Sequence, residues 1–311
     1  MSARSAAGRA ATIGVLLSLA GYTSFNLSDT IAKYLTDHLP ALELVAAMFV
    51  VTLLLSPVLV APRRLLTLHR LPRLPLLLVR SLCQLASSMC FIYAIAVLPL
   101  ADVIAIGFVS PFMITGLAAL FLHERVGPRR WIACIFGFIG ALVILRPGLE
   151  VEWGTAVLPL ANAFFYSTYC VLTRALGSHH DDRMLLAFNG LVGAPIMLAV
   201  MPFVGVWPQG WEWLGLAGIG LLSGLAHLLI IRAYRMAPAS LLAPFQYLEI
   251  VGITVLAYLA FGEFPDGWTW LGTAIIVSAG LFVFYRETML ARSQAPASAR
   301  PSPARISAIS A

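Results

Sequence analysis

The stretch Ile114-Thr115-Gly116-Leu117-Ala118-Ala119-Leu120 returns in closely similar form as Ile253-Thr254-Val255-Leu256-Ala257-Tyr258-Leu259, 139 residues further along the chain. The same offset places Pro99 on Pro238. Each copy lies in an apolar run long enough to cross a lipid bilayer. If each copy holds an odd number of crossings, the second half is upside down relative to the first. Such inverted repeats are typical of secondary transporters, whose two halves form alternative gates around one site.

The composition excludes a soluble protein. Hydrophobic residues make up 60% of the chain and charged residues 11%, and the mean hydropathy is +0.90. Ordinary globular proteins have roughly 25% charged residues. Lipid is therefore the expected solvent. The formal charge of +6 does not require a nucleic-acid partner, because basic residues in membrane proteins mark the cytoplasmic side.

A helix needs about 20 residues to cross about 30 Å of hydrocarbon, and the backbone must satisfy its own hydrogen bonds there. The apolar runs predict ten transmembrane helices, at residues 11–34, 41–60, 75–97, 101–122, 131–146, 154–175, 185–204, 213–231, 239–261 and 268–286.

Arginines gather in alternate loops between these spans, while the opposite loops carry mostly acids. The arginines are Arg63, Arg64, Arg70, Arg73, Arg125, Arg129, Arg130, Arg174, Arg183, Arg232 and Arg235. Both ends of the chain are also basic. The positive-inside rule therefore predicts that both termini are cytoplasmic, which requires an even number of spans. Ten spans satisfy that requirement.

The predicted fold class is an all-α integral membrane protein with ten transmembrane helices in two inverted five-helix repeats. The expected divisions are a cytoplasmic N-terminus at 1–10, the first repeat at 11–147, the second at 148–287 and a disordered cytoplasmic tail at 288–311. The tail is rich in Ala, Ser, Pro and Arg, a composition typical of disorder.

Several short patterns follow one another in an order known from one family. In the first half they are Asp29-x-x-x-Lys33, Arg80, Leu98-Pro99-Leu100-Ala101 and Glu124; in the second half they are Ala233-Tyr234, Pro238-Ala239-Ser240, Ala243-Pro244-Phe245-Gln246-Tyr247 and Glu263. Over about residues 11–287 the chain resembles the drug/metabolite transporter superfamily, in its EamA-type branch. The resemblance implies transport of a small organic solute across a bacterial inner membrane. Similar sequences often carry an arginine early in the second span, where Met48 stands here.

Two predicted helices carry matching polar stripes. The first has Tyr22, Asn26, Asp29 and Lys33 on one face, and the sixth has Asn162, Tyr166, Tyr169 and Thr173 at the same spacing. The stripes indicate either opposite walls of an aqueous cavity or hydrogen bonds that hold the helices together. Asp29 and Lys33 lie one turn apart and are expected to neutralise each other, as an outer gate or a structural clasp.

Two further charged residues fall inside predicted spans. Arg80, with Gln84, Ser87 and Phe91 on its face, is either a snorkelling cytoplasmic arginine or a receptor for a substrate anion. Glu249 lies near the middle of the ninth span, preceded by Gln246 and Tyr247. Apolar surroundings favour the neutral form of a carboxyl group. Glu249 is therefore either a proton-coupling or cation-recognising group, or a neutral acid bonded to a neighbouring helix.

Other residue types give weaker signals. His227 is isolated in its span and is read as structural more readily than functional. Ser178-His179-His180-Asp181-Asp182 has the residue types of a metal site, but adjacent residues rarely converge on one ion, so a solvated loop is expected. The four cysteines have no CxxC spacing and are read as small buried hydrophobes. No metal or cofactor is expected.

The preferred function is secondary transport by alternating access, with no enzymatic activity. Export of an amino acid or an amino-acid-derived compound, such as an opine-type metallophore, is chosen from what the resemblance implies. Uptake of a cofactor-like solute (S-adenosylmethionine or riboflavin) is the alternative, and a membrane-embedded enzyme or a channel is the alternative class. The expected partners are the lipid bilayer and a small-molecule substrate; a homodimer stays open. The expected location is the bacterial inner membrane.

Overall fold

The computed structural model describes residues 3–60, 72–121, 128–145, 153–176, 181–236 and 248–293. Within these ranges the chain is helical and forms no strand. The helices are α1 (Ala3–Leu35), α2 (Ala41–Leu59), α4 (Leu74–Val97), α5 (Leu100–Gly107), α6 (Ser110–Phe121), α7 (Pro128–Leu145), α8 (Trp153–Leu176), α9 (Asp182–Val204), α10 (Glu212–Met236), α12 (Leu248–Phe261) and α13 (Gly267–Ser293).

The helices agree with the predicted spans in order, and most differ from them only at the ends. Among the described residues, five apolar segments are long enough to cross a membrane by length and composition, and three shorter apolar helices accompany them. Helix α1 begins at Ala3 and α13 continues to Ser293, so both outer helices extend beyond the predicted spans. The ninth span is described only from Leu248, because residues 237–247 lie outside the described part of the chain.

The span predicted at 101–122 is present as the apolar segment Asp102–Phe121, but two helices form it. Phe108 and Val109 interrupt it between α5 and α6, with their amides donating to Ala105 O at 3.3 Å and Ile106 O at 3.0 Å in a tightened turn. Pro111 follows at once and has no amide hydrogen to donate to the preceding turn. The chain therefore starts a new helix here, and the residues of the interruption are buried.

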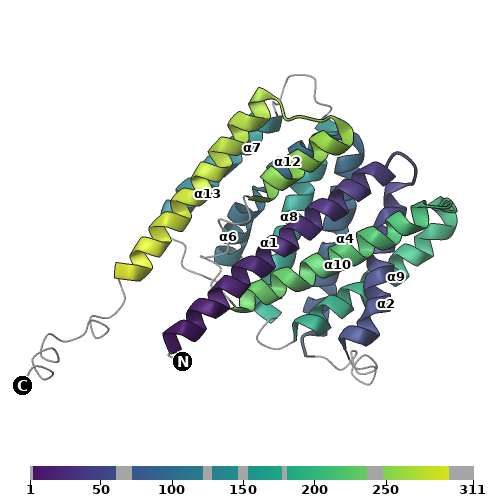
Figure 1. The fold of residues 1–311 in the computed structure, drawn as a ribbon, viewed down its shortest axis with the longest axis horizontal. Coiled ribbons are helices and arrows are strands. Elements are labelled where there is room, and N and C mark those ends of the chain that lie inside the picture. The colour runs from purple at the N-terminus through teal and green to yellow at the C-terminus, as the bar shows by residue number, and fades with distance from the viewer. Residues whose placement is uncertain are drawn as a thin grey trace, which may run out of the picture.

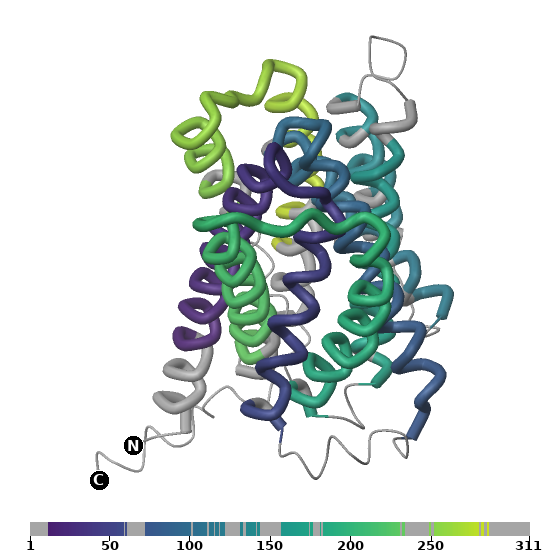
Figure 2. The backbone as a smooth tube through the Cα atoms, turned by 90° about the vertical axis from the view of Figure 1, so that its right-hand side faces the viewer, coloured from purple at the N-terminus to yellow at the C-terminus, as the bar shows by residue number. Residues whose placement is uncertain are grey.

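The strongest packing joins the two halves of the chain. Helix α1 packs on α10, α2 on α9, α4 on α8 and α7 on α13. In the order of the chain, α1, α2, α4 and α7 of the first repeat correspond to α8, α9, α10 and α13 of the second. Exchanging each helix for its counterpart turns the α1–α10 pair into the α8–α4 pair, and it leaves the α2–α9 and α7–α13 pairs unchanged. This exchange symmetry is that of two repeats related by a twofold axis. Helix α1 begins and α13 ends at the same end of the bundle (Figures 1 and 2), as an even number of crossings requires.

Small residues allow the two halves to approach closely. A Cβ added to Gly190 of α9 would lie 2.6 Å from the backbone nitrogen of Leu53 in α2. A Cβ on Gly252 of α12 would collide with the amide of Asn26 in α1. Helix association in lipid depends on such close packing, because the hydrophobic effect does not drive it. The second contact also positions part of the site.

Candidate functional site: a polar cavity between the two halves

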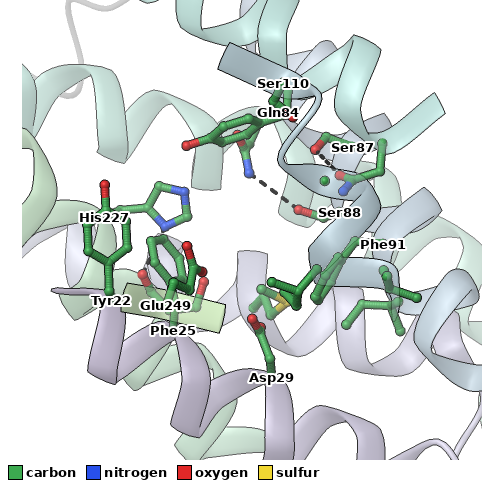
Figure 3. Close-up of a pocket in the computed structure, with 18 of the residues that line it drawn as sticks. Tyr22, Phe25, Asp29, Gln84, Ser87, Ser88, Phe91, Ser110, His227 and Glu249 are labelled. Carbon is green, nitrogen blue, oxygen red and sulfur yellow. Dashed lines mark hydrogen bonds between the residues drawn. The ribbon is translucent and has the colours of Figure 1, made fainter. Parts of the chain in front are cut away.

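A cavity of about 160 Å³ lies between the halves of the bundle. Helices from both repeats supply its walls: α1, α2, α4, α5 and α6 from the first half, and α8, α10 and α12 from the second. The residues that line it are Tyr22, Phe25, Asp29, Met48, Gln84, Ser87, Ser88, Phe91, Ile92, Val103, Ile104, Gly107, Phe108, Ser110, Asn162, Tyr166, Ser223, His227 and Glu249. Figure 3 shows His227 and Glu249 on one side of the cavity, the α4 serines on the other, and Asp29 below and between them.

The interruption between α5 and α6 forms part of the wall. Gly107, Phe108 and Ser110 all line the cavity at this point. The carbonyl of Ser110 accepts a hydrogen bond of 3.1 Å from Ser167 Oγ of α8. A broken helix is tolerated at membrane depth where side chains or a cavity satisfy its free backbone groups. Ser167 Oγ also lies 2.6 Å from Ala163 O of its own helix, so its one hydrogen is shared between the two carbonyls.

Two carboxylates come from opposite halves. Asp29 of α1 is 8% exposed, and Glu249 is the second residue of α12. The amide of Asn26, one turn before Asp29, donates to the backbone oxygen of Glu249 at 3.2 Å. This bond and the contact with Gly252 fix the start of α12 against α1. The polar stripe on α1 therefore both binds a neighbouring helix and faces the cavity.

His227 of α10 completes this side of the cavity. Its Nδ1 lies 2.9 Å from the carbonyl oxygen of Ser223, and its ring meets Phe25 edge-on with the centroids 5.0 Å apart. A carbonyl oxygen only accepts hydrogen bonds, so Nδ1 carries a proton. In the neutral imidazole, Nε2 is then an acceptor. His227 is thus a cavity residue, although the sequence favoured a purely structural role.

The α4 wall is held by side-chain hydrogen bonds. Ser87 Oγ donates to Asn162 Oδ1 of α8 at 2.8 Å, and Gln84 Nε2 donates to Ser88 Oγ at 3.4 Å. Gln84 is 8% exposed, and its Oε1 has no hydrogen-bond partner among the described residues. A buried acceptor without a partner is costly. Its position on the cavity wall makes it available to a bound solute.

Arg80 does not belong to the cavity wall, and neither sequence-based interpretation describes its surroundings. The side chain is fully buried, so it does not snorkel. Its Nε donates to Thr173 Oγ1 at 2.7 Å, and its terminal nitrogens donate to Leu185 O at 3.1 Å, Asn189 Oδ1 at 2.9 Å and Tyr169 Oη at 3.0 Å. The guanidinium carbon also lies 4.4 Å from the centre of the Tyr169 ring. These partners occupy four of the five N–H donors of the guanidinium, and they join α4 to α8 and α9.

Lys33 has a different partner from the one expected. Its Nζ donates to Ile95 O at 2.7 Å and Leu98 O at 3.0 Å, at the C-terminal end of α4, and lies 3.7 Å from Glu263 Oε1. The other oxygen of Glu263 accepts from the Leu100 amide at 3.1 Å, at the start of α5. The predicted Asp29–Lys33 pair was therefore wrong. The clasp that Lys33 makes joins the two halves, which leaves Asp29 facing the cavity.

The structure brings together several of the residues singled out from the sequence. Tyr22, Asp29, Gln84, Asn162, Tyr166 and Glu249 line the cavity, while Asn26, Lys33, Arg80 and Tyr169 hold the helices that surround it. Gln246 and Tyr247 lie outside the described residues. Sequence reasoning missed Phe25, Met48, Ser88, Ser110 and Ser223 as cavity residues. The proline after the α5–α6 interruption was the available signal for Ser110.

The loops that carried the charge argument are mostly outside the described residues. These include the segments 61–71, 122–127 and 177–180, and with them His179 and His180. The described residues hold no group of three or more potential metal ligands. Cys83, Cys90 and Cys170 are free and half-buried.

A helical membrane bundle of two repeats around a polar cavity has the architecture of a membrane transporter. The chain belongs to the EamA-like transporter family, whose model matches residues 12–146 and again residues 153–285. Both repeats predicted from the sequence are thus repeats of one family unit. A crystal structure of a protein with 20% sequence identity superposes on 93% of this chain and 99% of its own, with a TM-score of 0.64, and shows the same fold.

Named relatives are transporters of small molecules. The riboflavin transporter of Vibrio cholerae is 34% identical over 197 residues, which cover 63% of this chain and 66% of that protein, slightly under two thirds of its length. The pseudopaline exporter CntI of Pseudomonas aeruginosa is 32% identical and covers 86% of this chain and 94% of its own. An S-adenosylmethionine uptake transporter of Rickettsia bellii is 26% identical and covers 89% and 94%. The chain is thus similar to membrane transporters of small molecules.

Proposed function

We propose that this protein is a secondary transporter of the bacterial inner membrane that exports a small polar metabolite by alternating access. The observation that carries the proposal is the cavity, whose walls come from both repeats and hold Asp29, Gln84, Asn162 and Glu249. Polar groups at membrane depth are expensive unless they serve a pathway or a partner. A site at the interface of two inverted repeats is reached from either side when the halves rock against each other.

The proposed cargo is an amino acid or an amino-acid-derived compound. Support comes from the similarity to the pseudopaline exporter, which extends over 94% of that protein. A second candidate is uptake of a cofactor-like solute, supported by the similarity to riboflavin and S-adenosylmethionine transporters. The two candidates use the same cavity and differ in the cargo and in the direction of its net movement.

The Lys33–Glu263 clasp is the proposed outer gate. It joins the C-terminal end of α4 and the start of α5 to the segment between α12 and α13. Opening toward that side requires the clasp to separate. Both chain termini are proposed to be cytoplasmic, because the alternating loop arginines favour that orientation. The clasp then lies on the periplasmic side.

Glu249 is the proposed proton-coupling group. In a low-dielectric cavity, a carboxyl group that binds and releases a proton costs less electrostatic free energy than one that stays permanently charged. Asp29 from α1, Gln84 from α4 and His227 from α10 also face the cavity and share its field. A solute that displaces the proton of Glu249 would couple its movement to the proton gradient.

A deletion strain tests the direction and the class together. Untargeted metabolomics of cells and medium should show one small polar compound that accumulates inside the cells and is depleted outside, and complementation should reverse both changes. Intracellular depletion instead would favour the uptake candidate. Recovery of the compound chemically unchanged after passage through vesicles containing the purified protein distinguishes transport from catalysis. Non-saturating flux at channel rates would overturn the alternating-access proposal.

A further inference from the structure

We infer that the cavity recognises a solute through a positively charged, hydrogen-bond-donating group, such as an ammonium, held between Asp29 and Glu249. This inference rests on the proposed transport function and specifies the chemistry of its cargo. It follows from the hydrogen-bonding capacity of the cavity wall, counted atom by atom.

The two carboxylates and two further side chains of the wall, Gln84 and His227, offer acceptors to a solute. Both carboxylates only accept when ionised, and no described residue donates a side-chain or backbone hydrogen bond to either carboxyl group. Gln84 Oε1 is a buried acceptor without a partner in the described chain. His227 uses Nδ1 as a donor to Ser223, so Nε2 of the neutral ring is a further acceptor. A ligand that satisfies these groups must bring donors.

The charges of the cavity wall also favour a cationic solute. No lysine or arginine is among the described residues that line the cavity. The buried Arg80 is held by four oxygen atoms of α8 and α9, and Lys33 is held at the end of α4. Two carboxylates facing one small cavity repel each other when both are ionised. A cation placed between them removes that repulsion, whereas an anion increases it.

Aromatic rings surround the same space. Phe25 packs against His227 at the Glu249 side of the cavity, and Tyr22, Phe91 and Tyr166 also line it. The face of an aromatic ring attracts a desolvated organic cation. The cavity therefore offers acceptors for an ammonium group and flat apolar surfaces for the carbon skeleton attached to it.

Three probes of similar size test the inference on the purified full-length protein: 2-phenylethylammonium, the neutral 2-phenylethanol and the anionic 3-phenylpropionate. Isothermal titration at one pH should give a dissociation constant for the ammonium at least about tenfold below those of the other two. Asp29→Asn and Glu249→Gln should each weaken ammonium binding about tenfold, and Gln84→Leu by a smaller factor. Glu212→Gln is the matched control, because Glu212 lies outside the cavity and caps its own helix through Gln209.

Equal or tighter binding of 3-phenylpropionate, or unchanged ammonium affinity in both carboxylate variants, would overturn the inference. If one carboxylate variant does not yield folded protein, the other and Gln84→Leu carry the test. Vesicles that exchange a metabolite while the protein prefers the anionic probe would leave the transport proposal standing without the charge inference. Selective ammonium binding without exchange of any solute would support the charge inference and contradict the transport proposal.

Discussion

Lys33 Nζ and Glu263 Oε1 lie 3.7 Å apart across the boundary between the two repeats. The lysine comes from the first helix of the first half, and the glutamate follows α12 in the second half. Lys33 also binds the last carbonyls of α4, where the negative end of the helix dipole favours a cation. Glu263 binds the first amide of α5, where the positive end favours an anion. Each partner is thus held by a helix end as well as by the other.

Breaking this clasp is expected to open the bundle on that side. Glu263→Gln removes one charge and leaves a side chain of nearly the same size. A partly exposed ion pair contributes about 1 kcal/mol, so the open population should rise about fivefold. The measurement is the rate at which a membrane-impermeant maleimide labels Ser88→Cys in a protein whose native cysteines are replaced.

The double variant Lys33→Met/Glu263→Gln supplies the control for that experiment. If the two residues act as one clasp, the second change should add little to the labelling rate of the first. The pair would not control access if the increases in labelling rate of Lys33→Met and Glu263→Gln multiplied in the double variant. The same conclusion would follow if neither single variant changed the labelling rate.

Arg80 is expected to be essential for the stability of the bundle. Lysine keeps the charge, but it lacks the planar fork that reaches Thr173, Asn189 and Tyr169 together. Arg80→Lys should therefore destabilise the protein by about 3 kcal/mol, because a buried charge loses most of its hydrogen bonds. Thermal unfolding in detergent, followed by size-exclusion chromatography, measures the effect. Arg183→Lys on the exposed surface of α9 is the matched control and should unfold like the unaltered protein.

The hydropathy pattern predicted the helices well because each span must satisfy its own backbone in lipid, a requirement that local sequence reveals. The internal repeat also predicted two related halves. The partners of Lys33 and Arg80 could not be read in this way. Lys33 has an acid one turn away at Asp29, yet its ion pair is with Glu263, more than two hundred residues later. Local spacing gives the face of a helix, whereas the partner depends on which helices pack together.

The position of His227 illustrates the same limit. No neighbouring residue in α10 marked it as part of a site. It reaches the cavity because α10 packs along α1, which brings its ring against Phe25. The α5–α6 interruption was closer to being predictable, because Pro111 removes a backbone donor in the middle of an apolar run. A proline inside a membrane span is common, however, and does not by itself distinguish a kink from a break.

Gly252 is expected to tolerate no side chain. A Cβ at this position would meet the Asn26 amide, which bonds to the backbone of Glu249. Gly252→Ala should push α12 away from α1, lower the stability by about 1–3 kcal/mol and reduce transport. Gly224→Ala in α10 is the matched control, since its nearest neighbour would be a Leu55 methyl group 3.9 Å away. Thermal unfolding and vesicle transport of both variants measure the difference, and equal behaviour would contradict the role given to this contact.

Glu249→Gln is expected to separate net transport from exchange. Glutamine fills the same space and accepts a hydrogen bond, but it cannot carry a proton through the cycle. Vesicles with the variant should therefore lose accumulation of the metabolite driven by a pH gradient while they retain exchange of labelled for unlabelled metabolite at saturating concentration. Exchange survives because it requires the cavity to open alternately to the two sides only while metabolite is bound. Net coupled transport also requires the cavity to return with a proton bound in place of the metabolite. The Asp29→Asn variant, measured in the same two assays, shows whether the second carboxylate takes part. Accumulation that remains driven by the pH gradient in Glu249→Gln vesicles would assign the coupling to another group, with Asp29 and His227 as the remaining titratable side chains on the described cavity wall.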